Sequence, residues 1–151
     1  MKILLVSEYF PPIVYGGGEL SAENLAKSLA EKGVKVDVLT SYFKGLKETE
    51  DKYKIFRRLK SGDAKTLFGN IKRKLFFQKS LKKELKKLKE YDVIHFLNTT
   101  SIPSIKLKAK TIATHNNYTC FCPKSNLFYK ERIVCEGCNS SKFIGCMLNS
   151  K

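Results

Sequence analysis

Residues 1–29 read MKILLVSEYFPPIVYGGGELSAENLAKSL, and the rest of the chain is organised around this stretch. Residues 3–6 form an apolar, unbroken run, which is typical of a strand buried on both faces of a parallel sheet. Pro11 and Pro12 exclude a regular element and predict an extended loop. Three glycines, residues 16–18, follow. An amphipathic pattern then predicts a helix that ends at Gly33.

This order of strand, glycine loop and helix predicts a binding site for an anion or a sugar. Without a Cβ the backbone approaches a ligand closely, and the N–H groups of the first helical turn point towards it. Three glycines alone would indicate only a tight turn. Their position between a buried strand and a helix, with Glu19 directly after them, favours a ligand site. The loop matches neither the G-x-G-x-x-G fingerprint nor a P-loop.

Further strands are predicted along the chain, separated by helices or crossovers. The second strand covers residues 36–41, a short charged edge strand covers residues 54–59, and the last two cover residues 91–96 and 110–114. This alternation predicts an α/β fold with a Rossmann-like open parallel sheet, strand order 3-2-1-4-5. Ligands of such sheets bind at the carboxyl ends of the strands, here near strands one and four.

Two histidines stand where these strands deliver side chains to that edge. His95 is placed at the end of the strand at residues 91–96, and His115 directly follows the strand at residues 110–114. A histidine at such a place either contacts a ligand or packs against the strand end. Its ordinary pKa near neutrality allows it to orient a ligand or to supply charge.

The chain of 151 residues carries a net charge of +15, which favours anionic partners. A predicted helix at residues 66–90, broken near Gly69 and Asn70, concentrates this charge. It is interpreted either as a packed helix with a solvated lysine face or as a basic amphipathic helix on anionic lipid. Its predicted apolar positions are Leu67, Ile71, Leu75, Leu81, Leu85 and Leu88.

The sequence has neither a membrane-spanning run nor the pattern of a signal peptide, so we expect a cytoplasmic location. The basic helix indicates an alternative location, in which the chain contacts the inner face of the membrane. Nucleic acid is not expected as a partner, because the sequence has no nucleic-acid-binding motif and few interleaved aromatic residues.

All five cysteines fall in the last 32 residues, with the spacing C-x-C-x12-C-x2-C-x7-C. A reducing compartment argues against a disulfide framework. Cysteines at such short range suit a tetrahedral zinc site, and an iron–sulfur cluster uses the same ligands. Unligated cysteines in a loop are the simpler alternative.

The opening stretch resembles the start of family 4 glycosyltransferases of the GT-B type. Tyr9, Pro11 and Pro12 match the family's Tyr-x-Pro-Pro, and Gly17, Gly18 and Glu19 match its Gly-Gly-acidic motif. The family's Gly-His-x-Val before the second strand is Gly-Val-Lys-Val here. Its Asp-Val-Ile-His strand matches residues 92–95. Its Thr-His pair matches residues 114–115, with Asn116 in place of the usual Asp.

The resemblance implies transfer of a sugar, as by a hexosyltransferase, from a nucleotide-sugar donor to a hydroxyl acceptor on a lipid-linked or cell-surface glycan. Gly17 and Gly18 would lie near the donor phosphates, Glu19 near the acceptor or the loop that holds it, and His115 at the sugar as the catalytic residue. His95 and Asn116 would be further substrate contacts. The family generally needs no metal for catalysis.

A subset of the family also has a Cys-Pro pair and further cysteines after this histidine. By that comparison a structural zinc would be held by Cys122, Cys135, Cys138 and Cys146, with Cys120 as an extra cysteine.

The resemblance also implies a domain organisation. Residues 1–118 correspond to the acceptor-side, N-terminal domain of a GT-B enzyme, and residues 119–151 form a Cys-rich loop segment that is the incomplete end of the same domain. Because the donor site belongs to a C-terminal domain, we expect a fragment or split subunit that is inactive without a partner polypeptide. The alternative is a non-catalytic module that binds an anionic ligand or a membrane surface.

Overall fold

The computed structural model describes residues 1–50, 52–88, 90–99, 101–116, 118, 122, 127–129 and 133–148. The chain divides into two compact units, Met1–Thr114 and His115–Lys151. Each unit is described by itself. The domain boundary after residue 118 stays a prediction.

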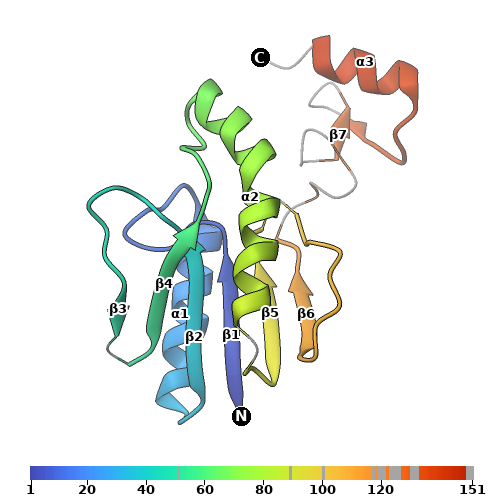
Figure 1. The fold of residues 1–151 in the computed structure, drawn as a ribbon. Helices are drawn as coiled ribbons and strands as arrows, with labels where there is room; N and C mark the ends of the chain where they lie inside the picture. The colour runs from blue at the N-terminus through green and yellow to red at the C-terminus, as the bar shows by residue number, and fades with distance from the viewer. Residues whose placement is uncertain are drawn as a thin grey trace. The chain divides into compact units, whose positions relative to one another are not determined.

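The first unit is built on one sheet with the strand order β3-β4-β2-β1-β5-β6 (Figure 1). Every neighbouring pair is parallel except β3 and β4, which are antiparallel. In chain order the five parallel strands therefore run 3-2-1-4-5, which confirms the predicted fold. The bounds are β1 (Lys2–Ser7), β2 (Lys35–Ser41), β3 (Thr49–Glu50), β4 (Lys54–Leu59), β5 (Val93–Leu97) and β6 (Lys110–Thr114).

Two details of the sheet differ from the sequence-based prediction. The strand at residues 54–59 was expected at the sheet edge, but the two-residue strand β3 pairs with its outer side. At the opposite edge, all five residues of β6 are exposed, although parallel strands are usually covered on both faces. The described residues of the crossover before β6, 101–109, form no regular element.

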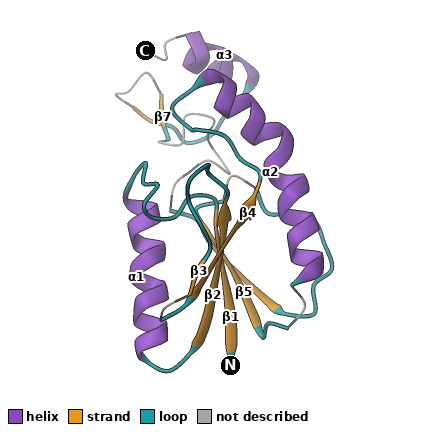
Figure 2. Cartoon of the chain, turned by 60° about the vertical axis from the view of Figure 1, so that its left-hand side comes forward, coloured by secondary structure: helices purple, strands orange, loops and turns teal. Residues whose placement is uncertain are grey.

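Helices α1 (Gly17–Glu31) and α2 (Leu67–Lys87) lie on opposite faces of this sheet (Figure 2). Side chains alternate between the faces of a strand, so β1 contributes to two cores. Leu4 and Val6 join the cluster under α2, whereas Ile3 and Leu5 join the cluster under α1. The unbroken apolar run at the start of the chain is thus explained by burial on both faces.

Helix α2 is continuous, so the predicted break near Gly69 and Asn70 was wrong. Thr66 caps its start, because the hydroxyl oxygen accepts a hydrogen bond of 3.0 Å from the backbone N–H of Gly69. At 1.5 Å per residue this helix is about 30 Å long, whereas strands of five to seven residues span roughly 17–23 Å. The first turns of α2 therefore extend past the sheet (Figure 1).

The side of α2 on which a residue lies determines whether its side chain is buried. Phe77, Leu81 and Leu85 are buried against the sheet. Ile71 and Leu75, which were predicted to belong to the buried stripe, are exposed. At about 100° per residue, Leu75 lies roughly 160° around the helix from Phe77 and therefore points away from the sheet.

The second unit contains more regular structure than the loop segment that was predicted. A hairpin joins β7 (Phe128–Tyr129) to β8 (Ile133–Val134), and α3 (Ser140–Leu148) follows. None of the side chains described in this unit is buried. Its described part therefore has no hydrophobic core.

Candidate active site

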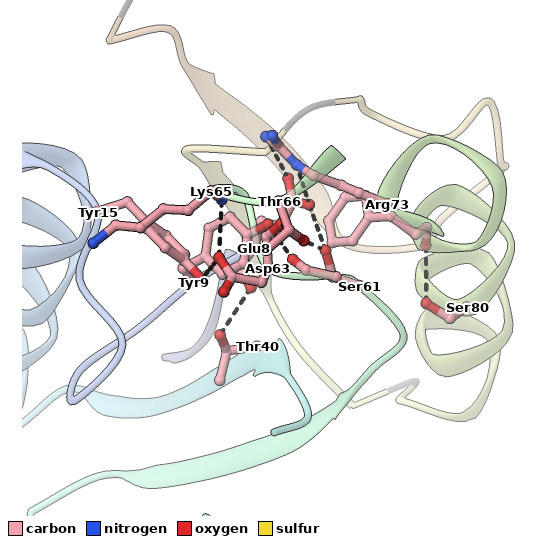
Figure 3. A network of polar contacts seen from close by, with 12 residues as sticks. Glu8, Tyr9, Tyr15, Thr40, Ser61, Asp63, Lys65, Thr66, Arg73 and Ser80 are labelled. Carbon is pink, nitrogen blue, oxygen red and sulfur yellow. Dashed lines mark hydrogen bonds and ion pairs between the residues drawn. The ribbon is translucent and has the colours of Figure 1, made fainter. Parts of the chain in front are cut away.

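The carboxyl end of β1 carries a buried acidic residue that organises the surrounding loops (Figure 3). Glu8 is completely buried, and its Oε1 lies 2.7 Å from Nε of Arg73 on α2. The second carboxylate oxygen accepts from Nη2 of the same arginine at 3.3 Å, and the hydroxyl of Ser61 donates to Oε1 at 2.8 Å. This two-point ion pair holds α2 to the edge of the sheet where ligands of such folds bind.

Tyr9 and Tyr15 extend this network into the proline loop. The Tyr9 hydroxyl donates to the carbonyl of Gly62 at 2.7 Å, and the guanidinium of Arg73 lies 5.5 Å from the centre of the Tyr9 ring. Tyr15 packs edge-on against Tyr9 with 4.6 Å between the ring centres, and donates to Oδ1 of Asp63 at 2.8 Å (Figure 3).

Both tyrosines of this network remain protonated donors at neutral pH. Burial, followed by the hydrogen bond to Asp63, raises the pKa of Tyr15 to about 12. Burial is also the main reason that the pKa of Tyr9 is raised. Both hydroxyls can therefore donate these hydrogen bonds throughout the physiological pH range.

The predicted glycine loop leads directly into α1, which begins at Gly17. The carboxylate of Glu19 accepts a hydrogen bond of 2.9 Å from the backbone N–H of Gly16, and so caps the helix start from within its first turn. Glu19 is itself buried. The remaining N–H groups of this turn have no partner within the helix itself, which is the usual basis of anion binding at such a position.

Asn98 connects the end of β5 to this helix start. Its side-chain amide donates to the carbonyl of Gly18. A Cβ added to Gly18 would lie only 2.5 Å from Oδ1 of Asn98, so any other residue here would force the Asn98 side chain to shift. Asn98 also has a positive φ of 48°, which asparagine tolerates better than most residues. The glycine loop is thus located between the ends of β1 and β5, which are the first and fourth parallel strands.

His95 lies in the middle of β5, not at its end as predicted. Its Nε2 is 2.8 Å from the hydroxyl of Thr114 on the neighbouring strand. The imidazole is partly buried, and burial lowers its pKa, so this histidine is neutral at pH 7. Its contact with substrate remains a prediction.

His115 and Asn116 directly follow β6 and are the first residues of the second unit. Both side chains are exposed. Because β6 runs parallel to β5, its carboxyl end belongs to the same edge of the sheet as the ends of β1 and β5. The catalytic role of His115 and the substrate contact of Asn116 stay predictions.

Zinc binding by the four predicted ligands stays a prediction, because no three His, Cys, Asp or Glu side chains of the described residues are close enough together to hold an ion. Cys122, Cys135, Cys138 and Cys146 all line one pocket of about 250 Å³. The structure records no disulfide among these four residues.

Sequence reasoning missed Glu8, Arg73 and Asn98. An acidic residue directly after a buried strand was a usable signal for Glu8. Arg73 is the only arginine among the cations of α2, and arginine suits buried two-point ion pairs better than lysine does. No comparable signal distinguished Asn98, whose contact depends on a helix start 80 residues away in the chain.

These features define an α/β domain of the Rossmann type with a ligand-binding edge formed by a glycine loop, a helix N-terminus and strand ends. The family model described as Glycosyltransferase Family 4 matches residues 15–132, which is most of the chain. The chain therefore belongs to glycosyltransferase family 4. No curated protein matches the chain in a sequence search.

Proposed function

We propose that this domain forms the acceptor side of an enzyme that transfers a hexose from a nucleotide-sugar donor to a hydroxyl acceptor. In this reaction the bond between the anomeric carbon and the phosphate oxygen breaks, and the nucleoside diphosphate leaves. The acceptor oxygen then bonds to the anomeric carbon and loses its proton. The observation that carries the proposal is the glycine loop and helix N-terminus at the carboxyl ends of β1 and β5, within a chain of this family.

Each site residue has a role that its chemistry suits. The N–H groups around Gly17 and Gly18 would stabilise the charge on the departing phosphate. Glu19 would hold the loop, which its hydrogen bond to Gly16 supports. His115 would donate a hydrogen bond at the sugar and phosphate, with His95 and Asn116 as further substrate contacts. No metal ion is required for these steps.

The proposal includes a second polypeptide or domain that binds the donor nucleotide. The open edge at β6 supports this part, because all five of its residues are exposed and Ile112 is 50% accessible. An uncovered strand with a single neighbour readily pairs with further chain. A partner at this edge would complete both the sheet and the cleft.

The experiment adds a donor-binding domain to this chain. A second α/β domain encoded beside this chain would be co-expressed with it, and release of UDP or GDP from UDP- and GDP-linked hexoses would be measured with glycan acceptors. We expect turnover only when both polypeptides are present. His115→Ala should lower that turnover by about 100-fold, because a hydrogen bond to developing charge is lost.

Two results would contradict this proposal. If no pair of polypeptides releases nucleotide from any of these donors, the chain is not half of a glycosyltransferase. If turnover occurs and His115→Ala leaves it unchanged, the transfer reaction stands but the role of His115 is rejected. Lys44→Ala, on an exposed loop far along the chain from His115, serves as the control for unspecific loss.

A second proposal, supported by the exposed end of α2, is that the chain binds the anionic inner face of a membrane from the cytoplasm. Phe68 is 77% exposed, and Ile71, Leu75 and Phe76 are also exposed in the overhanging part of this helix. Exposed lysines of the same helix surround them, as in basic amphipathic helices that lie on lipid. Among the described residues, no helix is long and apolar enough to cross a bilayer.

We expect the chain to sediment with vesicles of phosphatidylcholine and phosphatidylglycerol, and much less with phosphatidylcholine alone. The double variant Leu75→Gln, Phe76→Gln should weaken this binding at least tenfold, because two apolar side chains no longer enter the lipid. Leu20→Gln is the matched control, since Leu20 is 47% exposed on α1. If both variants lose vesicle binding equally, or if the chain binds neutral and anionic vesicles equally well, the α2 surface is excluded as the site of contact.

A further inference from the structure

The described residues of the second unit bury little apolar surface. None of its described side chains is buried, and Ile133 and Val134 of its hairpin are about two-thirds exposed, at 64% and 66%. Apolar burial within the described part is therefore too small to stabilise this unit.

Four cysteines converge on one pocket of this unit from different places in the chain. Cys122 precedes the hairpin, Cys135 directly follows β8, Cys138 lies in the loop before α3, and Cys146 lies on α3 itself. The pocket of about 250 Å³ is also lined by Leu127, Phe128 and Phe143. Three of these cysteines are partly buried and Cys138 is exposed, so thiols and apolar side chains line the same pocket, which favours ligation of a soft metal ion.

We propose that Cys122, Cys135, Cys138 and Cys146 bind one zinc ion, and that this ion folds the second unit. Four thiolates from a short segment are the ligand set of a closed, tetrahedral structural zinc site. The ion would have no part in catalysis, so this proposal is independent of glycosyl transfer.

Ion binding must draw the four sulfur atoms inward. As the described part of the chain stands, no three His, Cys, Asp or Glu side chains are close enough together to hold an ion. The thiol of Cys135 donates to the carbonyl of Gly137 at 3.2 Å, and that of Cys138 points towards the carbonyl of Asn139 at 3.9 Å. Zinc replaces the thiol protons and releases these contacts. Zinc binding and folding of this unit are therefore coupled.

The test uses the full chain purified under reducing conditions. Metal analysis should find one zinc per chain, and replacement by Co²⁺ should produce the visible absorption bands of tetrahedral cobalt–thiolate coordination. Tryptic cleavage after Lys142, which lines the pocket, should be at least tenfold slower with zinc than after chelation. Cys135→Ser, Cys138→Ser and Cys146→Ser should each reduce bound zinc to less than half.

Cys120→Ser is the matched control, because Cys120 belongs to the same cluster in sequence but is not among the four proposed ligands. It should retain the full zinc content. The proposal is overturned if the wild-type chain binds neither zinc nor cobalt, if the chain carries iron with a charge-transfer spectrum, or if mass spectrometry finds these cysteines in disulfides. Equal loss of zinc in Cys120→Ser would refute the ligand assignment. The free energy of unfolding of the first unit, measured in urea, should be unchanged in each variant. This result shows that the loss of zinc affects only the second unit.

Discussion

Glu8→Gln should destabilise the first unit by about 3 kcal/mol, because it removes the negative charge of a completely buried carboxylate that Arg73 holds at two points. The carboxylate of Glu8 is 0% exposed and the Arg73 side chain 25%. The amide keeps the shape of the carboxylate, so packing changes little. The free energy of unfolding is measured by urea titration followed by far-UV circular dichroism, which reports the loss of α1 and α2.

The chain offers a matched control for this prediction at its surface. Arg58 holds Glu48 through Nε at 2.6 Å and Nη2 at 3.0 Å, in the same two-point geometry as Arg73 and Glu8. Both of its side chains are 39% exposed, so solvent screens the pair. Glu48→Gln should therefore cost less than about 1 kcal/mol. Equal losses in the two variants would show that burial does not determine the strength of the Glu8 pair.

Phe77→Ala should cost about 3–5 kcal/mol, which is typical for removing a buried phenylalanine from a core. Phe77 is 1% exposed and packs with Leu81 and Leu85 in the cluster between α2 and the sheet. Its loss leaves a cavity where α2 crosses the sheet edge, close in sequence to Arg73. The measurement is again the free energy of unfolding in urea, with the slope of the transition compared to confirm that the same surface is exposed.

The neighbouring residue Phe76 provides the control, because it carries the same side chain on the same helix but is 45% exposed. Phe76→Ala changes helix propensity by the same amount as Phe77→Ala. It should cost less than about 1 kcal/mol, since little buried area is lost. A loss as large as that of Phe77→Ala would mean that the overhanging face of α2 is covered in solution by another part of the protein.

Local pattern was sufficient to predict the sheet and its ligand-binding edge. The run at residues 3–6 is apolar and unbroken, and Val36, Val38 and Leu39 make most of the second strand apolar, which suits strands covered on both faces. The alternation of strands with helices or crossovers, read as a Rossmann-like sheet, then predicted the strand order. Gly33 ends α1 with a φ of +75°, as its position after the amphipathic segment predicted.

The buried face of α2 could not be predicted in the same way. Apolar residues occur on several sides of its first half, so periodicity indicated Ile71 and Leu75 as well as Leu81 and Leu85. The structure buries Phe77, Leu81 and Leu85, because that side of the helix faces the sheet, whereas Leu75 lies roughly 160° around the helix from Phe77. Which of several apolar sides faces the sheet is a property of the assembled domain.

The sequence by itself was sufficient to predict the five parallel strands, the two helices beside them and the place of the glycine loop, because these follow from patterns of residues that are neighbours in the chain. Only the tertiary structure decided that Glu8 pairs with Arg73, 65 residues away, and that Asn98 meets Gly18, 80 residues away. With 29 lysines and arginines in the chain, no local pattern identifies the one cation that a buried carboxylate selects. Glu8 pairs with Arg73 because, in the folded domain, this position of α2 lies next to the end of β1.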